Sequence, residues 1–135
     1  MRVLFLIALL SLVRGLSAED YVVVVAKDSP ITVDDAGKIR EIFLKKRNFD
    51  NQTRVIPINL IGEERVRTEF ETQVLQMSRD EINRYWITSH FQGVSPPTTQ
   101  ASLQSVKRFI QSVNGAIGYL PRDMVDADLK IIYEF

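Results

Sequence analysis

The sequence has 135 residues with 17 basic and 17 acidic side chains, so its formal net charge is zero. A nucleic-acid-binding domain usually carries a strongly basic face, which this balance does not indicate. Cysteine is absent, which excludes disulfides and thiolate metal sites, so we expect packing to provide the stability.

The first 18 residues have the pattern of a secretory signal peptide. Arg2 is basic, Val3–Val13 is almost continuously apolar, and Ala18 is a small residue at a suitable cleavage point. This apolar run is shorter than the ~20 residues that a membrane span requires. We therefore expect export to the periplasm with cleavage near Ala18, which leaves residues 19–135 as one domain without a stable membrane span. A buried N-terminal helix or an uncleaved anchor is the alternative.

The first half of the remaining chain predicts two strands with a helix between them. Tyr21–Ala26 is an apolar, β-branched run of the kind that parallel sheets bury on both faces. A helix is predicted from an N-cap at Thr32 to Phe43. Val55–Leu60 is the second strand, and Pro57 within it favours an edge position or an irregular ladder.

Three further helices are predicted by apolar residues at helical spacing: Glu63–Gln76, a segment that begins after Ser78, and Leu103–Val113. Ser78 and Glu81 have the spacing of a capping box. Gly93–Thr99 contains two prolines and is expected to be a loop.

The segment Asn114–Pro121 (NGAIGYLP) predicts a helix end followed at once by a buried strand. Gly115 is interpreted as a C-cap glycine in the left-handed conformation. Gly118 indicates a bend or a close approach of other atoms to the backbone. With a last strand at Leu129–Tyr133, the alternation of strands and helices predicts an α/β fold with a mainly parallel sheet flanked by helices.

The sequence offers no catalytic or cofactor motif. His90 is the only histidine, and no nucleophile with an orienting acid stands at a suitable spacing, so the chain is not expected to be an enzyme. The acidic pairs Asp34-Asp35 and Glu63-Glu64 precede predicted helices, where capping is favoured over metal binding. Trp86 and its aromatic neighbours fit either a core or a ligand groove.

The loop at Gly62 is the best candidate for a ligand site. It joins a strand to a helix N-terminus, where free N–H groups attract anions, and Arg65 and Arg67 lie close by in the sequence. Glu63 and Glu64 oppose this interpretation because they would repel an anion. The predicted site is therefore an anion site at Gly62, Arg65 and Arg67, without a metal.

Several segments together resemble the phosphate-binding proteins of ABC importers. In order, they are IFLKKR at 42–47, VIPINL at 55–60, Arg67-x-x-Phe70, Tyr85-Trp86, FQGVSPP at 91–97 and NGAIGYLP at 114–121. The chain is most similar to the short, single-lobe members described as phosphate ABC transporter substrate-binding protein-like. The resemblance covers about Tyr21–Phe135 and implies one lobe of a type II periplasmic-binding-protein fold.

The chain departs from this family at the ligand. Family members carry Gly-Ser-Gly-Thr before the arginine that matches Arg67, and Glu63–Val66 occupy those places here. The resemblance thus implies an exported, non-catalytic solute-binding-like domain with weak or lost binding of phosphate or another small oxyanion. The alternative is a protein–protein interaction module of the cell envelope that has lost ligand binding. Arg67 is either an anion contact or part of a structural salt bridge.

Overall fold

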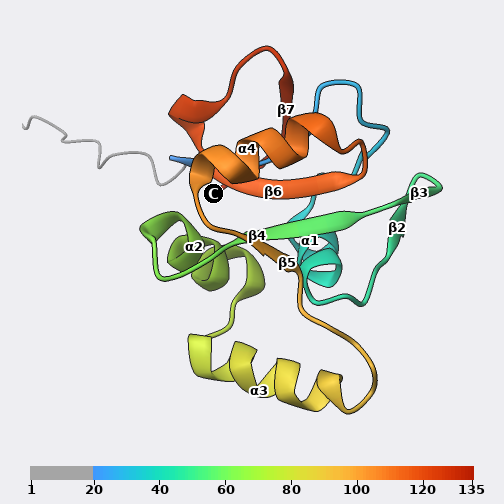
Figure 1. The fold of residues 1–135 in the computed structure, drawn as a ribbon, viewed down its shortest axis with the longest axis vertical. Helices are drawn as coiled ribbons and strands as arrows, with labels where there is room; N and C mark the ends of the chain where they lie inside the picture. Colours follow the sequence, from blue (N-terminus) through green and yellow to red (C-terminus); the bar gives the residue numbers. More distant parts are fainter. Residues whose placement is uncertain (1–19) are drawn as a thin grey trace, which may run out of the picture.

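The computed structural model describes residues 20–135, which form the α/β domain shown in Figure 1. The signal peptide predicted for residues 1–18 lies outside the described residues. Among residues 20–135, no helix has both the length and the apolar character that crossing a membrane requires.

A mixed five-stranded sheet forms the centre of the domain, in the order β5-β4-β6-β1-β7. Its strands are β1 (Tyr21–Ala26), β4 (Ile56–Leu60), β5 (Thr98–Gln100), β6 (Ala116–Pro121) and β7 (Leu129–Glu134). β4 is parallel to both β5 and β6, whereas β1 is antiparallel to β6 and β7. All strands except β1 therefore point the same way, which confirms the predicted α/β class.

The interior strand β1 is buried as its apolar sequence predicts, and Val22–Val25 are inaccessible to solvent. β1 is antiparallel to both of its neighbours, although apolar runs of this kind are common in parallel strands. Burial here follows from its place between β6 and β7 in the sheet, beneath helices on both faces. The apolar run therefore reports a covered strand and carries no information about direction.

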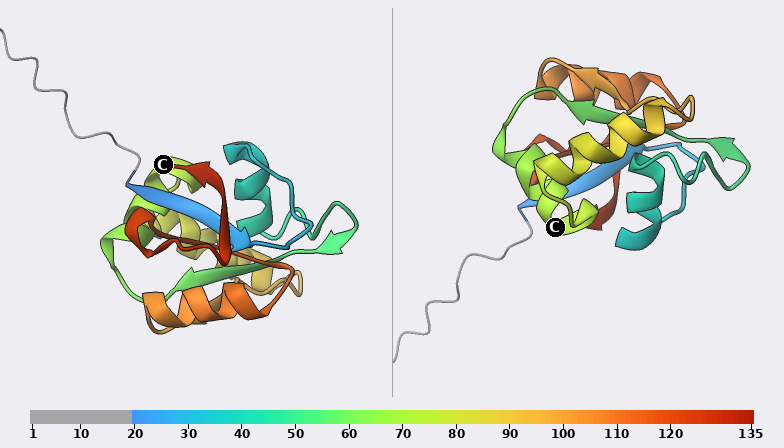
Figure 2. Two further views of the ribbon diagram at one scale, coloured as in Figure 1. Left: turned by 90° about the horizontal axis from the view of Figure 1, so that it is seen from above. Right: turned by 90° about the horizontal axis from the view of Figure 1, so that it is seen from below.

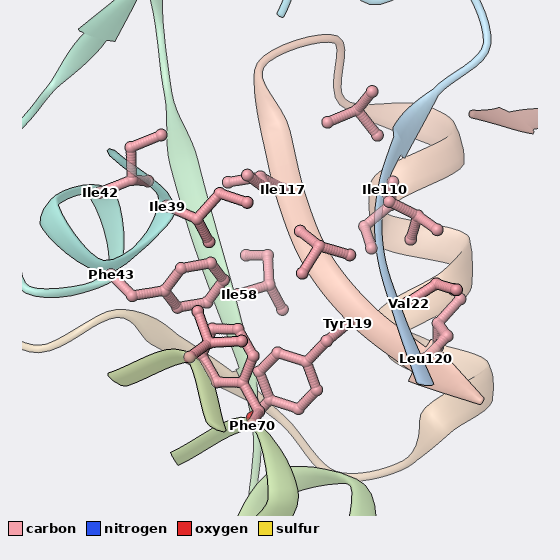
Figure 3. Packing of buried hydrophobic residues seen from close by; sticks show 14 of the residues in the cluster. Val22, Ile39, Ile42, Phe43, Ile58, Phe70, Ile110, Ile117, Tyr119 and Leu120 are labelled. Atoms are coloured by element: carbon pink, nitrogen blue, oxygen red, sulfur yellow. The ribbon is translucent and has the colours of Figure 1, made fainter. Parts of the chain in front are cut away.

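The helices cover both faces of the sheet, as Figure 2 shows. α1 (Ala36–Phe43) and α2 (Arg65–Phe70) lie on one face, and α4 (Leu103–Ser112) lies on the other. Figure 3 shows the aromatic centre of the core on the first face, where the Phe70 and Tyr119 rings stack with centroids 4.3 Å apart. Phe43 packs edge-on against Phe70 at 4.7 Å. Contacts of this geometry add to the stabilisation from burial alone.

The first helix begins later than the sequence predicts. The Thr32 N–H donates to Asp50 Oδ2 at 2.8 Å, which ties Thr32 to a short hairpin made of β2 (Phe49–Asp50) and β3 (Thr53–Arg54). Asp35 caps α1 instead, and its Oδ1 accepts from the Lys38 N–H at 2.8 Å. The Thr32 cap was wrong: the hydrogen bond to Asp50 ties Thr32 to the hairpin, three residues before Asp35, which takes the capping position.

The next two helices follow their predicted patterns. α2 begins at Arg65 and continues as a π-helical turn, η1 (Glu71–Leu75). α3 (Arg79–His90) begins with the predicted capping box between Ser78 and Glu81, in which both reciprocal hydrogen bonds are present. The π turn places Glu71 in the interior, where its side chain is 9% exposed.

The Asn114–Pro121 segment ends a helix and forms the buried strand β6, as predicted, but Gly115 does not have the left-handed conformation. Val113 is the C-cap residue of α4. A Cβ on Gly115 would collide with the carbonyl oxygen of Arg54, so close approach explains this glycine. Gly118 shows the predicted close approach, because its Cβ would lie 2.7 Å from Ile110 Cδ1 of α4.

Pro57 lies neither in an edge strand nor at a register shift, because β4 stands between β5 and β6 and pairs regularly with both. The Ile56 N–H donates to the Gly115 carbonyl toward β6, so the nitrogen of Pro57 faces the opposite side. Pairing with β5 begins only at Ile58, and no partner is lost at Pro57. The predicted loop Gly93–Thr99 was partly wrong, since it gives way to β5 at Thr98. A 3-10 turn, η2 (Arg122–Met124), precedes β7.

Candidate functional site

An open groove lies where the parallel strands β4 and β5 end, between the sheet and α3. Its volume is about 730 Å³. Side chains of β4, β5, α2, α3 and the segment between α3 and β5 line it: Asn59, Arg67, Ile82, Asn83, Trp86, Ile87, His90, Phe91, Pro96, Pro97 and Thr99. In open α/β sheets, ligands bind outside the carboxyl ends of the strands, where this groove lies.

Three polar residues form a row across the sheet toward the groove. Asn59 pairs with Thr99 on β5, and the Tyr119 hydroxyl from β6 donates to Asn59 Oδ1 at 2.9 Å. The same hydroxyl accepts from the Leu60 N–H at 3.2 Å. A tyrosine hydroxyl carries its proton at neutral pH and can donate, and burial raises the pKa of Tyr119 further, to about 12. The Asn59 amide oxygen is thereby occupied, and its NH₂ group remains as a donor at the groove.

The guanidinium of Arg67 is held at the groove by two groups of the domain. Nη1 donates to the Leu60 carbonyl at 2.7 Å, and Nε lies 3.6 Å from Glu71 Oε2. Nε is a buried atom without a hydrogen bond in the described part of the chain. Arg79 binds the other carboxylate oxygen of Glu71 with Nη2 at 2.7 Å and Nε at 3.0 Å. Two cations therefore share one buried carboxylate.

Helix α3 forms a mainly apolar wall of the groove and stands apart from the sheet in Figure 1. Only Ile82 and Ser89 of this helix are buried, while Ile87 is 61% exposed. The Tyr85 hydroxyl anchors the helix by donating to the Leu44 carbonyl at 2.6 Å. Trp86, next to it, is half-buried. It packs against the core and also lines the groove, so it has both of the roles, core and ligand groove, that the sequence allowed.

The structure places the predicted anion residues in different surroundings. Arg67 lines the groove, whereas Gly62 and Arg65 do not. Gly62 has a φ of 88°, and its carbonyl accepts from Arg79 Nη2 at 3.4 Å. Arg65 is exposed at the start of α2, beside the exposed residues Glu63 and Glu64.

The structure also places His90 and the acidic residues that the sequence singled out. His90 is the exposed last residue of α3; it lines the groove, and its ring lies 6.0 Å from that of Phe91. Asp35 is a helix cap, as predicted. Within residues 20–135, no group of three or more His, Cys, Asp or Glu side chains could hold a metal ion.

Sequence reasoning missed several residues of the groove. Asn59 and Thr99 carry no motif, and only the pairing of β4 with β5 brings them together. Glu71 had a weak signal, because it stands one helical turn after Arg67, at the i, i+4 spacing of ion pairs.

Comparisons with known proteins find this fold in phosphate receptors. One is a protein of Clostridium perfringens described as a phosphate ABC transporter substrate-binding protein, solved with bound phosphate, with a TM-score of 0.68 and 14% identity. Another is an ABC-type phosphate transport receptor of Vibrio cholerae, with a TM-score of 0.67 and 17% identity. The matches cover 84% and 85% of this chain, but 44% and 46% of theirs. No family model and no curated protein sequence matches the chain.

These structures define the fold class of the chain. It has the α/β fold of a phosphate ABC transporter substrate-binding protein, over less than half the length of each receptor, as expected for a single-lobe relative. At 14% and 17% identity, the similarity to these receptors shows a shared fold only. The residues of the groove have to be judged on their own chemistry.

Proposed function

We propose that this chain is an exported, non-catalytic solute-binding domain that captures phosphate or another small oxyanion weakly. The observation that carries the proposal is the guanidinium of Arg67 in the wall of a groove at the carboxyl ends of β4 and β5. Gly62 and Arg65 do not line the groove, and we infer that the exposed guanidinium of Arg65, close after Gly62, attracts the anion from outside it. The signal-like pattern of residues 1–18 supports export to the periplasm.

Three features favour weak rather than tight binding. Glu71 offsets part of the charge of Arg67, and the exposed carboxylates of Glu63 and Glu64 oppose an incoming anion. The phosphate receptors that share the fold are more than twice as long as the part matched here. An open groove on one lobe leaves more of a small ligand in solvent than an enclosed site does.

Calorimetric titration with phosphate and then sulfate tests the proposal. We expect saturable heat with a dissociation constant on the order of 1 mM, which corresponds to roughly −4 kcal/mol. Arg65→Ala should weaken binding without affecting the fold, because this side chain is exposed. Arg67→Gln should abolish the heat, while Arg108→Ala on the distant helix α4 serves as the matched charge control.

Thermal unfolding of each variant separates a binding effect from a structural one. If Arg67→Gln lowers stability while phosphate still binds, Arg67 is a structural residue and not an anion contact. Flat titrations of the unaltered protein up to millimolar phosphate and sulfate contradict oxyanion capture.

The exposed face of α3 favours a second candidate function, an envelope interaction module without ligand binding. Ile87 is 61% exposed and Phe91 is 85% exposed, and they stand one helical turn apart. Exposed apolar side chains that cluster in this way often mark protein contacts. A photocrosslinker at position 91 that captures one envelope protein, when the same group at position 108 does not, would favour this function.

A further inference from the structure

The groove has two chemically different walls. On the sheet side, Asn59, Thr99 and Arg67 bring an amide NH₂ group, a hydroxyl and a guanidinium to the groove. On the opposite side, α3 and the segment before β5 supply mainly apolar side chains, among them Ile82, Trp86 and Pro97, with Asn83 and His90 as the polar exceptions. Such a division suits a ligand with one charged end and one apolar part better than it suits an ion that is polar on all sides.

The donors on the polar wall are held in fixed directions. Tyr119 occupies the Asn59 amide oxygen at 2.9 Å, which leaves the amide NH₂ group without an acceptor in the described part of the chain. The Leu60 carbonyl holds Nη1 of Arg67 at 2.7 Å, and no hydrogen bond of Nη2 occurs within residues 20–135. Groups fixed by the fold lose little freedom when they bind a carboxylate.

The local charge favours an anion of low charge. Arg67 and Arg79 together carry two positive charges around the single buried carboxylate of Glu71, which leaves an excess of one. A monocarboxylate matches this excess. Glu63 and Glu64 repel any anion, and the repulsion grows with its charge, so an oxyanion with two charges is disfavoured more than a monocarboxylate.

We propose that the groove binds an organic monocarboxylate, with the carboxylate on Asn59 and Arg67 and an apolar body against Trp86. This inference rests on the proposed solute-binding function and names its ligand class. The volume of about 730 Å³ lies within the range of small-molecule sites, ~300–1,000 Å³. A free acid and the C-terminal residue of a peptide both present this chemistry.

The tryptophan of the groove provides a direct reporter, because Trp86 is the only tryptophan of the chain. Cyclohexylacetate, its neutral amide and inorganic phosphate are titrated separately while Trp86 fluorescence and heat are recorded. We expect cyclohexylacetate to change the fluorescence saturably and to bind at least about tenfold more tightly than either the amide or phosphate. A tripeptide ending in leucine distinguishes a peptide terminus from a free acid.

Charge variants test whether binding occurs at this groove. Asn59→Asp keeps the oxygen that Tyr119 needs but replaces the donor with a negative charge, so we expect cyclohexylacetate to bind at least about tenfold more weakly. Asn83→Asp lies on the exposed surface of α3 and should weaken binding by roughly fivefold without affecting the fold. Asn114→Asp, at the opposite end of the sheet, is the matched control and should bind normally.

The outcomes separate this inference from the proposed function. If phosphate binds but cyclohexylacetate does not, the ligand class is wrong and oxyanion capture remains. If cyclohexylacetate and its amide bind equally, or if Asn83→Asp binds like Asn114→Asp, the carboxylate site is wrong. If no anion binds, the proposed function and this inference both fail.

Discussion

Gly115 and Gly118 show how single residues are constrained by neighbours distant in sequence. Both stand in one short motif, yet each faces a different part of the domain. Gly115 lies against the backbone of Arg54, whereas Gly118 lies beneath the side chain of Ile110 on α4. A backbone atom cannot easily move away from an added methyl group, but the end of a side chain can adjust.

We therefore expect Gly115→Ala to destabilise the domain more than Gly118→Ala, which should cost about 1–3 kcal/mol. Ile110→Val removes the Cδ1 atom that the added methyl group of Gly118→Ala would meet. The double variant Gly118→Ala/Ile110→Val should therefore be more stable than the sum of the single costs predicts, by about 1 kcal/mol. Urea midpoints measure all four variants, and strictly additive costs would contradict the proposed contact.

Among the structural elements, α3 and α4 differ in how firmly they join the core. α4 buries Val106 and Ile110 against the sheet, and its N-cap Ser102 accepts from the Ser105 N–H at 3.1 Å. α3 buries only Ile82 and Ser89, and polar contacts at Arg79 and Tyr85 provide much of its attachment to the body. Loss of a cap should therefore have local effects in α3 and global effects in α4.

Ser78→Ala removes the capping box of α3 and should cost about 1 kcal/mol of helix stability. We expect faster amide hydrogen exchange throughout α3, with little change in β1 and β6. Ser102→Ala is the matched variant and should lower the unfolding free energy of the whole domain by a similar amount. Equal loss of protection in α3 and in the central strands after Ser78→Ala would contradict a loosely attached α3.

At the scale of the whole molecule, the buried side chain of Tyr119 links its own strand β6 to β4 and to α2. It bonds Asn59 and Leu60 of β4, and its ring stacks on Phe70. Desolvation by burial is the main cause that raises its pKa from 10.0 to about 12. An acid with a raised pKa in the folded state stabilises the fold below its unfolded pKa, and this contribution is lost as pH rises through the folded pKa.

We therefore expect the unfolding free energy to fall between about pH 10 and pH 12, as the unfolded chain loses the Tyr119 proton before the folded chain does. In Tyr119→Phe this fall should be smaller, although the variant is less stable at neutral pH because the Leu60 N–H loses its acceptor. Urea unfolding at a series of pH values measures both effects. Parallel pH profiles for the two proteins would contradict the raised pKa.

Much of the fold could be predicted from local patterns. The capping box at Ser78, the buried runs of β1 and β6, and the helix periodicity depend on residues near one another in sequence, so the chain itself displays them. β5 could not be found in this way because Thr98–Gln100 is short and polar. Thr32 looked like a helix cap because its neighbours in sequence fit one. Its hydrogen bond to Asp50, which is distant in sequence, could not be foreseen.

The candidate site was only partly visible in the sequence. Arg67 was identified, and Trp86 was recognised as either a core or a groove residue. Asn59 and Thr99 had no signal, because parallel pairing of β4 with β5 creates their proximity. The partnership of Arg67 with Glu71 and Arg79 also required the π turn that carries Glu71 inward.

The sequence by itself determined the α/β class, most of the strands and helices, and the resemblance to phosphate-binding proteins, because these follow from short-range patterns and their order. Only the tertiary structure decided the direction of β1, the reason for Gly115, and the groove between α3 and the sheet. All three features depend on contacts between segments that are distant in sequence. Strand pairing and packing of the whole chain set these contacts, and short-range patterns do not encode them.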